Sequence, residues 1–561
     1  MKLLQQLTLI GCMLIAVLGA YAQAPDTVDV EPGFNTLIDA VKANTGKVFR
    51  LKRGGVYLID AEVKPEGTAP FILIGEETPA DQPPAVVQRF TLPGGATWKR
   101  AIQIKSDGII KNIAFVGRTP NDEQYNYFIR MDSAGTSLTV NNCFFQGTRS
   151  YIIGLRKDYI SLDFRNNLVI GIGDPADWQN GYVFAAGGID PGLITMVNNT
   201  FMFYGSVLEY NAAAKIDKII FDHNTLAYLN REWFYVDPVV NRQYTNNIFF
   251  NVAMRGFVGP RPAWGYDAGD FSDDTDGDSL VGFVSVDTLS TWIEGIVDAE
   301  REIVFSNNLR FTTKQVLDFQ KETTATYMPT MNARTKGMFA TYPKMVAENN
   351  IFEEDGNVLD PNFVQLPPES ALDPYFKMVK GRRNESLREP DWPEDWFWDW
   401  DGDRTAILSW PPPINLMPQA VELNSAGSDG YPLGDLNWYG KEVREAWERG
   451  EDNPISAVAA KPGSKVPVEF TLAQNYPNPF NPSTTITFQL SKRSDVALEV
   501  FNMIGQKMRT LLNQTNHAAG NFDITWDGKA DNGQQLVSGV YFYRLMVENK
   551  MVATRKMIMV K

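Results

Sequence analysis

A short motif recurs eight times between residues 111 and 352: two adjacent polar residues, most often Asn-Asn, followed by a small apolar strand. Its second polar residue falls at positions 112, 142, 167, 199, 224, 247, 308 and 350, at intervals of 30, 25, 32, 25, 23, 61 and 42 residues. A base interval of 23 to 25 residues, lengthened by insertions, is typical of one coil of a stacked solenoid. The repeat therefore predicts an all-β protein built as a parallel β-helix.

The repeated asparagines suit the turns of such a solenoid. Successive coils stack about 4.8 Å apart, so equivalent side chains form columns. A carboxamide both donates and accepts hydrogen bonds, so we expect the asparagines to form a ladder, with the aromatic residue that follows each pair in the core. His223 occupies the first-asparagine place of one repeat. We interpret it as a ladder hydrogen-bonding residue, with a catalytic base as the alternative.

The two ends of the repeat region carry a family resemblance. Helical spacing over Phe34–Val41 predicts an amphipathic cap, and a Gly55-Val56-Tyr57 strand follows. This order resembles the entry of pectin-lyase-like right-handed β-helices, and Ser425–Trp438 resembles the closing motif of secreted β-helix proteins. The resemblance covers about residues 30 to 440. It implies a right-handed parallel β-helix with capping segments and insertions over residues 23–440, a fold that hosts lyases, hydrolases and adhesins.

Residues 1–22 predict a secretory signal peptide. Lys2 precedes a 12-residue apolar run, Leu9–Ala20, and Ala20-Tyr21-Ala22 then offers a cleavage site between Ala22 and Gln23. The run is shorter than the roughly 20 residues that span a bilayer. Cys12, inside the run, leaves a lipoprotein signal as an alternative. We expect a mature chain without a transmembrane segment.

A second module follows a linker at residues 441–466. Residues 467–561 contain short alternating strands separated by turn signals, which predict a small immunoglobulin-like β-sandwich. The segment resembles the type A C-terminal sorting domain of the type IX secretion system through the motifs Tyr476–Thr484, Val500–Gln506, Trp526–Lys529 and Ser538–Phe542. The resemblance implies a Bacteroidetes-type bacterium, export through the periplasm by that machinery, and an extracellular or outer-membrane surface location.

The composition excludes several classes of function. Lys and Arg total 52 and Asp and Glu total 67, a net charge of −15, which argues against nucleic-acid binding. Two histidines and two cysteines argue against a multi-histidine or cysteine metal centre.

Charged residues seven or eight places after the paired asparagines are candidate catalytic groups: Arg231, Glu232 and Arg255. Equal offsets place them on neighbouring coils. A lyase acting on uronates needs a cation to neutralise the sugar carboxylate and a base to remove the α-proton. The alternative is a salt-bridged edge of the solenoid.

Two further clusters suggest binding. Asp274, Asp276 and Asp278 have the spacing of the first half of a Ca²⁺ loop and predict a Ca²⁺ site, with an exposed acidic insertion as the alternative. Aromatic rings suit stacking on sugars. Four tryptophans are therefore candidate substrate-binding residues, or else seal the side of the helix: Trp392, Trp396, Trp398 and Trp400.

Two hypotheses of function remain open from the sequence. The first is a secreted or cell-surface β-helix protein that acts on or binds polysaccharide, as a lyase or hydrolase of an acidic polysaccharide. The second is a non-catalytic surface adhesin or glycan-binding protein.

Overall fold

The computed structural model describes residues 26–78, 82–90, 100–117, 127–148, 150–172, 181–204, 208–209, 216–229, 234–235, 239–254, 283–286, 296–322, 329–331, 333–356, 358–383, 410–455 and most of 471–560. The chain divides into two units, Met1–Ser456 and Ala457–Lys561.

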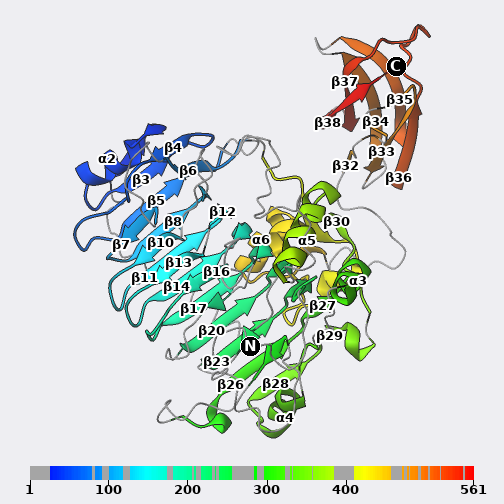
Figure 1. Cartoon of the computed structure of the whole chain (residues 1–561). Helices are drawn as coiled ribbons and strands as arrows, with labels where there is room; N and C mark the ends of the chain where they lie inside the picture. The colour runs from blue at the N-terminus through cyan, green and yellow to red at the C-terminus, as the bar shows by residue number, and fades with distance from the viewer. Residues whose placement is uncertain are drawn as a thin grey trace. The chain divides into compact units, whose positions relative to one another are not determined.

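The first unit is a parallel β-helix, as predicted (Figure 1). Among the described residues, each full coil passes through three parallel sheets, A, B and C, as in β8, β9, β10 and then β11. Sheet A consists of β1 (Thr27–Val30), β3 (Val48–Leu51), β5 (Phe71–Gly75), β8 (Gly108–Lys111), β11 (Ser137–Asn141), β14 (Ser161–Arg165), β17 (Leu193–Val197), β20 (Ile216–Asp222), β23 (Val239–Thr245), β26 (Glu302–Ser306) and β28 (Met345–Glu348). Sheet B consists of β2 (Gly33–Phe34), β4 (Val56–Ile59), β6 (Ala85–Arg89), β9 (Ile113–Val116), β12 (Phe144–Gln146), β15 (Leu168–Ile172), β18 (Thr200–Tyr204), β21 (Thr225–Ala227), β24 (Ile248–Phe250), β27 (Leu309–Phe311) and β29 (Ile351–Phe352). Sheet C consists of β7 (Ile102–Ile104), β10 (Tyr127–Met131), β13 (Tyr151–Leu155), β16 (Tyr182–Ala185) and β19 (Leu208–Glu209).

The turn between sheets A and B holds the asparagine ladder. Asn199 shows the pattern: its main-chain N and its Nδ2 both donate to Asn224 Oδ1, each at 3.0 Å, and its Nδ2 also donates to the Phe164 carbonyl at 2.9 Å. Because the asparagine side chains of this ladder are buried and hydrogen-bonded from Asn167 to Asn308, the ladder fixes the stacking of the coils. Its rungs are Asn167, Asn199, Asn224, Asn247, Asn308 and Asn350.

The predicted register is wrong by one residue in the first two repeats. Asn112 and Asn142 do not lie in the ladder but in the column beside it, where each turn has a left-handed residue with φ near +55°. Cys143 takes the ladder place instead and donates its main-chain N–H to Asn167 Oδ1. Asparagine tolerates the left-handed region better than other non-glycine residues, which explains why two asparagines so often lie together at this turn.

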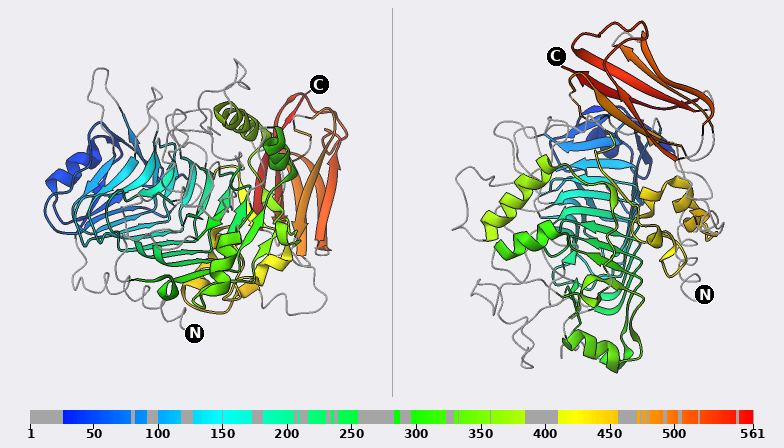
Figure 2. Two further views of the ribbon diagram at one scale, coloured as in Figure 1. Left: turned by 60° about the horizontal axis from the view of Figure 1, so that its bottom comes forward. Right: turned by 90° about the vertical axis from the view of Figure 1, so that its right-hand side faces the viewer.

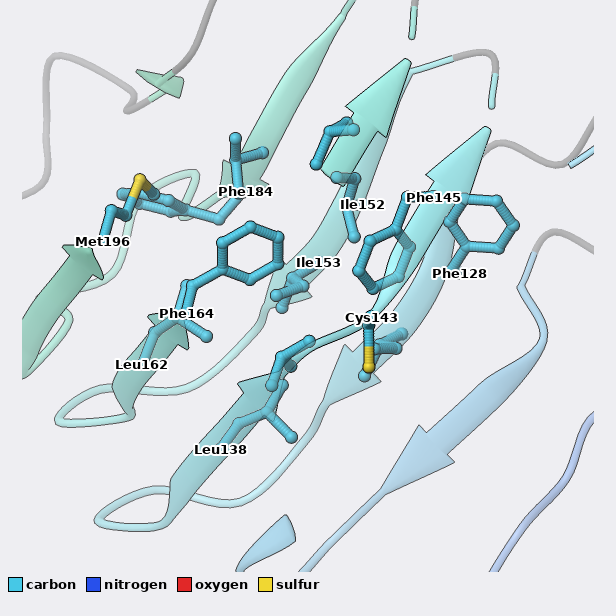
Figure 3. Close-up of a cluster of buried hydrophobic side chains, with 14 of the residues drawn as sticks. Phe128, Leu138, Cys143, Phe145, Ile152, Ile153, Leu162, Phe164, Phe184 and Met196 are labelled. Carbon is cyan, nitrogen blue, oxygen red and sulfur yellow. The ribbon is translucent and has the colours of Figure 1, made fainter. Parts of the chain in front are cut away.

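The interior of the helix is filled by apolar side chains in columns, including the aromatic residues predicted to point inward (Figure 3). Phe115 stacks on Phe145 with ring centroids 5.2 Å apart, and Phe145 contacts Phe164 at 5.8 Å. Helix α2 (Thr36–Ala43) covers the N-terminal end through Leu37, Ile38 and Val41, which confirms the predicted cap.

The outer face of sheet B is partly covered by other segments (Figure 2). Helices α3 (Lys314–Glu322) and α5 (Glu369–Arg383) pack on the apolar outer face of sheet B, together with β31 (Asn415–Pro418), which pairs with β30 (Phe363–Gln365). Helix α4 (Ala333–Thr341) precedes the last coil, and β22 (Phe234–Tyr235) pairs with β25 (Val284–Ser285) in a separate short sheet.

Residues 426–448, which we call the clasp, run along the turns between sheets A and B. Asn307 Nδ2 donates to the Ala426 carbonyl at 2.9 Å, and Asn166 Nδ2 donates to Glu448 Oε1 at 3.1 Å, so the clasp crosses all the coils between these two. Gly434 has φ +81°, and a Cβ there would meet Thr225 Oγ1 at 2.6 Å, so the close approach requires glycine. The clasp ends in helix α6 (Lys441–Glu448), so the start of the predicted linker 441–466 is instead a packed helix.

The second unit is a small immunoglobulin-like β-sandwich, as predicted. Its described strands form two antiparallel sheets around one core that includes Trp526 and Tyr543. One sheet has β32 (Thr471–Leu472), β33 (Thr484–Leu490) and β36 (Gly520–Trp526), and the other has β34 (Ser494–Asn502), β35 (Lys507–His517), β37 (Gly539–Val547) and β38 (Lys550–Met559).

Candidate functional site

The outer face of sheet C carries a cluster of aromatic and cationic side chains. Parallel pairing places Tyr127 beside Tyr151 and Tyr151 beside Tyr182, so one tyrosine is contributed by each of three successive coils. The rings of Tyr127 and Tyr151 are stacked, with centroids 4.6 Å apart and planes inclined by 17°. The stacked pair, with Tyr182 in register beside it on the next coil, forms an aromatic strip across three coils.

Three arginines border this strip. Arg156 lies over both rings, with its guanidinium carbon 5.6 Å from the Tyr151 centroid, and donates to the Tyr151 hydroxyl. Arg100 Nη1 donates to the Tyr127 hydroxyl at 3.4 Å. We call Arg100, Tyr127, Arg130, Tyr151 and Arg156 the tyrosine–arginine surface.

Two carboxylates hold the arginines in place. Arg130 and Gln103 both donate to Asp132, while Arg100 pairs with Glu62 at 3.1 Å. Burial by itself would lower the pKa of Arg130, but its hydrogen bonds to Asp132 and Tyr127 raise that pKa above its usual value. These contacts fix the positions of Arg100 and Arg130 on the surface of a chain whose net charge is −15.

Gly154 makes this packing possible. It follows Tyr151 on β13, and a Cβ at this position would approach Tyr151 Cε2 to 3.1 Å and Arg156 Nε to 3.5 Å. Because a side chain here would push the ring and the guanidinium apart, the absence of one lets Arg156 lie against both tyrosines.

The arrangement suits a sugar polymer that carries negative charge. Aromatic faces stack on the C–H faces of sugar rings, and arginine binds carboxylate or sulfate groups through two parallel hydrogen bonds. Tyr127 and Tyr182 are buried, whereas Tyr151 and Arg156 are partly exposed, so a sugar chain lying along the helix axis would meet the Tyr151 ring and the Arg156 guanidinium.

The candidate residues from the sequence lie outside the described residues. This holds for Arg231, Glu232 and Arg255, for the Ca²⁺ candidates Asp274, Asp276 and Asp278, for Trp392, Trp396, Trp398 and Trp400, and for the cleavage site Ala22 and Gln23. Within the described part of the chain, no group of three His, Cys, Asp or Glu side chains is placed to hold a metal ion.

His223 is placed where its structural interpretation predicts, in the turn between sheets A and B, but beside the ladder and not in it. Its ring is fully buried under the clasp, with Nδ1 at 3.0 Å from Asp222 Oδ2 and Nε2 at 3.6 Å from Asp429 Oδ2. Burial alone would lower the pKa of His223, but the charges of Asp222, Asp429 and Asp435 raise it to about 9. A buried imidazolium with no access for substrate does not fit a catalytic base.

The tyrosine–arginine surface was not predicted from the sequence. Its signal is the interval of 24 residues between Tyr127 and Tyr151, which equals one coil. That interval becomes visible only when the strands of sheet C are aligned, because the loops before them differ in length.

Comparison with known proteins gives a family match for the second unit. Residues 475–550 match the sequence model of the FlgD Ig-like domain family. No curated protein matches the chain.

Three solved structures show partial likenesses. Dimeric latent PorU from Porphyromonas gingivalis is 21% identical, with a TM-score of 0.15, over 17% of this chain and 10% of PorU. PorZ, a surface component of the type IX secretion system of the same organism, is 17% identical, with a TM-score of 0.12, over 16% of this chain and 11% of PorZ. The PL6 family alginate lyase AlyGC is 15% identical, with a TM-score of 0.24, over 40% of this chain and 36% of AlyGC. This chain thus spans little more than a third of the length of AlyGC and about a tenth of the other two.

Among the described residues, no helix has both the length and the apolar composition needed to cross a membrane. The protein is a parallel β-helix followed by an immunoglobulin-like domain.

Proposed function

We propose that the protein is a secreted or cell-surface β-helix protein that binds an acidic polysaccharide along sheet C. The stacked Tyr127–Tyr151 pair bordered by arginines carries this proposal. It presents the partly exposed Tyr151 ring with fixed positive charges beside it, a combination that suits an anionic sugar chain.

Binding is tested by titrating the mature protein with polygalacturonate, alginate and chondroitin sulfate in a calorimeter, with dextran as the neutral polymer. Tyr151→Ala and Arg156→Ala are each expected to weaken binding of the acidic polymer by about tenfold or more, because each removes one stacking or charged contact. Arg50→Ala is the matched control, since Arg50 pairs with Asp29 on the outer face of sheet A. Equal affinity in all variants, or equal binding of dextran, would show that the tyrosine–arginine surface does not hold the sugar.

A second candidate is a lyase or hydrolase of the same polysaccharide. It is supported by the Tyr151 hydroxyl beside the Arg156 guanidinium, since a tyrosine can exchange a proton while the cation neutralises a uronate carboxylate. A rise in ultraviolet absorbance during incubation with polyuronate would report the unsaturated product of β-elimination. If the protein binds the polysaccharide but produces neither this rise in absorbance nor new reducing ends, the result favours a non-catalytic, glycan-binding adhesin.

Export is the other part of the proposal. The motifs of residues 467–561 support delivery by the type IX secretion system through the periplasm to the cell surface. The two units divide at Ser456 and Ala457, and each has a hydrophobic core of its own. Deleting residues 467–561 is therefore expected to leave a folded β-helix in the periplasm, as measured by cell fractionation and protease accessibility. A truncated protein found at the cell surface would contradict this.

A further inference from the structure

From Asn167 onward, the asparagine ladder builds the same small site in each successive coil. For the last rung, Asn308 main-chain N and Nδ2 donate to Asn350 Oδ1 at 3.0 and 3.1 Å, and Asn350 Nδ2 donates to the Phe305 carbonyl at 2.7 Å. In each carboxamide, the oxygen therefore accepts from the main-chain N and the Nδ2 of the preceding rung. The amide nitrogen donates to the main-chain carbonyl that lies three residues before that rung. The same three groups bind the earlier rungs. For example, Asn247 Oδ1 accepts from the main-chain N and the Nδ2 of Asn224, and Asn247 Nδ2 donates to the Phe221 carbonyl.

At the C-terminal end of the β-helix, Asn350 and the Ala347 carbonyl form the same site, but no asparagine of a described coil occupies it. Among the described strands, β28 and β29 are the last of sheets A and B, so no coil that the structure describes follows Asn350 and the Ala347 carbonyl (Figure 1). Ala347 pairs in register with Phe305 of β26. Because main-chain carbonyls alternate in direction along a parallel strand, the Ala347 carbonyl points away from β26. Among the described residues, none accepts a hydrogen bond from the Asn350 main-chain N–H. Two donors and one acceptor are thus left in the arrangement that holds a primary carboxamide.

A cavity of about 280 Å³ opens at these groups. Ala347, Asn350 and Phe352 line it together with the charged side chains of Lys336, Glu348 and Asp355. The volume is at the lower end of the range for small-molecule sites, so it suits one small ligand. Its charged residues offer both signs, which suits a zwitterion.

We propose that this cavity binds a free α-amino acid with a carboxamide side chain, L-asparagine or L-glutamine. The ligand's side-chain oxygen accepts from the main-chain N–H and Nδ2 of Asn350, and its amide nitrogen donates to the Ala347 carbonyl. Lys336 binds the α-carboxylate, while Glu348 and Asp355 bind the α-ammonium group. Aspartate and glutamate are rejected, because a carboxylate has no proton to donate and would face the Ala347 carbonyl oxygen. This site lies apart from sheet C and does not depend on the polysaccharide proposal.

The test uses the mature protein and saturation-transfer NMR with L-asparagine, L-glutamine, L-aspartate, L-glutamate and acetamide. We expect the two amides to bind at least about tenfold more tightly than the two acids. Ala347→Phe is expected to abolish binding, because residues at this place in earlier coils point inward, as Phe305 does, and a phenyl ring would fill the cavity. Ala134→Phe, in an exposed turn, is the matched control.

A second variant keeps the proposal testable if Ala347→Phe does not fold. Lys336→Gln, at an exposed position, should weaken the binding of L-asparagine several-fold and leave the binding of acetamide unchanged, since acetamide has no carboxylate. Equal binding of aspartate and asparagine, unchanged binding in Ala347→Phe, or no signal from either amide would each overturn the proposal.

Discussion

Asn247→Ala is expected to destabilise the β-helix by about 3–5 kcal/mol, because it leaves several buried polar groups without partners. Asn247 Oδ1 accepts from the main-chain N and the Nδ2 of Asn224, at 2.8 and 3.1 Å. Its Nδ2 donates to the Phe221 carbonyl at 3.0 Å and to Asn308 Oδ1 at 2.9 Å. All these groups lie where water does not reach, so none of the lost bonds is replaced.

Urea unfolding followed by circular dichroism measures this effect. Asn241→Ala is the matched control, because Asn241 lies on β23 of the same coil but makes its hydrogen bonds at the exposed outer face. Its loss should cost about 1 kcal/mol or less. If the two variants unfold at the same urea concentration, the ladder does not hold the coils together.

The repeat made the fold predictable because a solenoid repeats its chemistry at every coil. Each turn needs one residue that tolerates a left-handed backbone and one that bonds the next coil, and asparagine serves both needs. The same ambiguity caused the error at Asn112 and Asn142, since two adjacent asparagines do not reveal which of them is the rung. Cys143, which fills a rung through its main-chain N–H, carries no signal in the sequence.

The candidate site was less predictable than the fold. Tyr127, Tyr151 and Arg156 become neighbours through the pairing of β10 with β13, and each strand follows a loop of different length. Counting residues from the asparagine pair, as we did for Arg231 and Arg255, fixes positions only near the turn between sheets A and B. The sequence of Ser425–Trp438 indicates a closing segment, whereas α6 resembles a linker in sequence because its apolar face is short, with only Val443 and Ala446 buried.

The second large effect concerns the charge buried beneath the clasp. His223 and Asp222 form a fully buried pair, in which burial would raise the pKa of Asp222 but the imidazolium lowers it on balance. Asp429, whose carboxylate also accepts from Trp447 Nε1 at 2.7 Å, brings the clasp to the same imidazole ring. The pKa of His223 is raised to about 9, above the value near 6.5 expected in the unfolded chain. Its ionic contribution is therefore fully present below about pH 6.5 and lost as the pH rises through about 9.

His223→Asn isolates that contribution, because asparagine is the residue that the other coils place at this left-handed position, as in Asn198 and Asn246. The variant keeps the turn and a hydrogen-bonding side chain but cannot carry the charge. Its free energy of unfolding should be about 3 kcal/mol below that of the wild type near pH 6, and the difference should close by about pH 9.5.

The control places a histidine in the same column at an exposed position, where solvent screens the charges around it. Asn142→His adds an imidazole at an exposed left-handed position beside Asn112, so its pKa should stay near 6.5 and its effect on stability should not vary with pH. A His223→Asn deficit that is equal at both pH values would mean that the ring acts by shape alone. If the difference in free energy of unfolding between His223→Asn and the wild type disappears at high pH, while the effect of Asn142→His stays constant, the buried ion pair contributes to the clasp contact. Alkaline conditions then weaken that contact, because Asp222 and Asp429 face each other across a neutral ring.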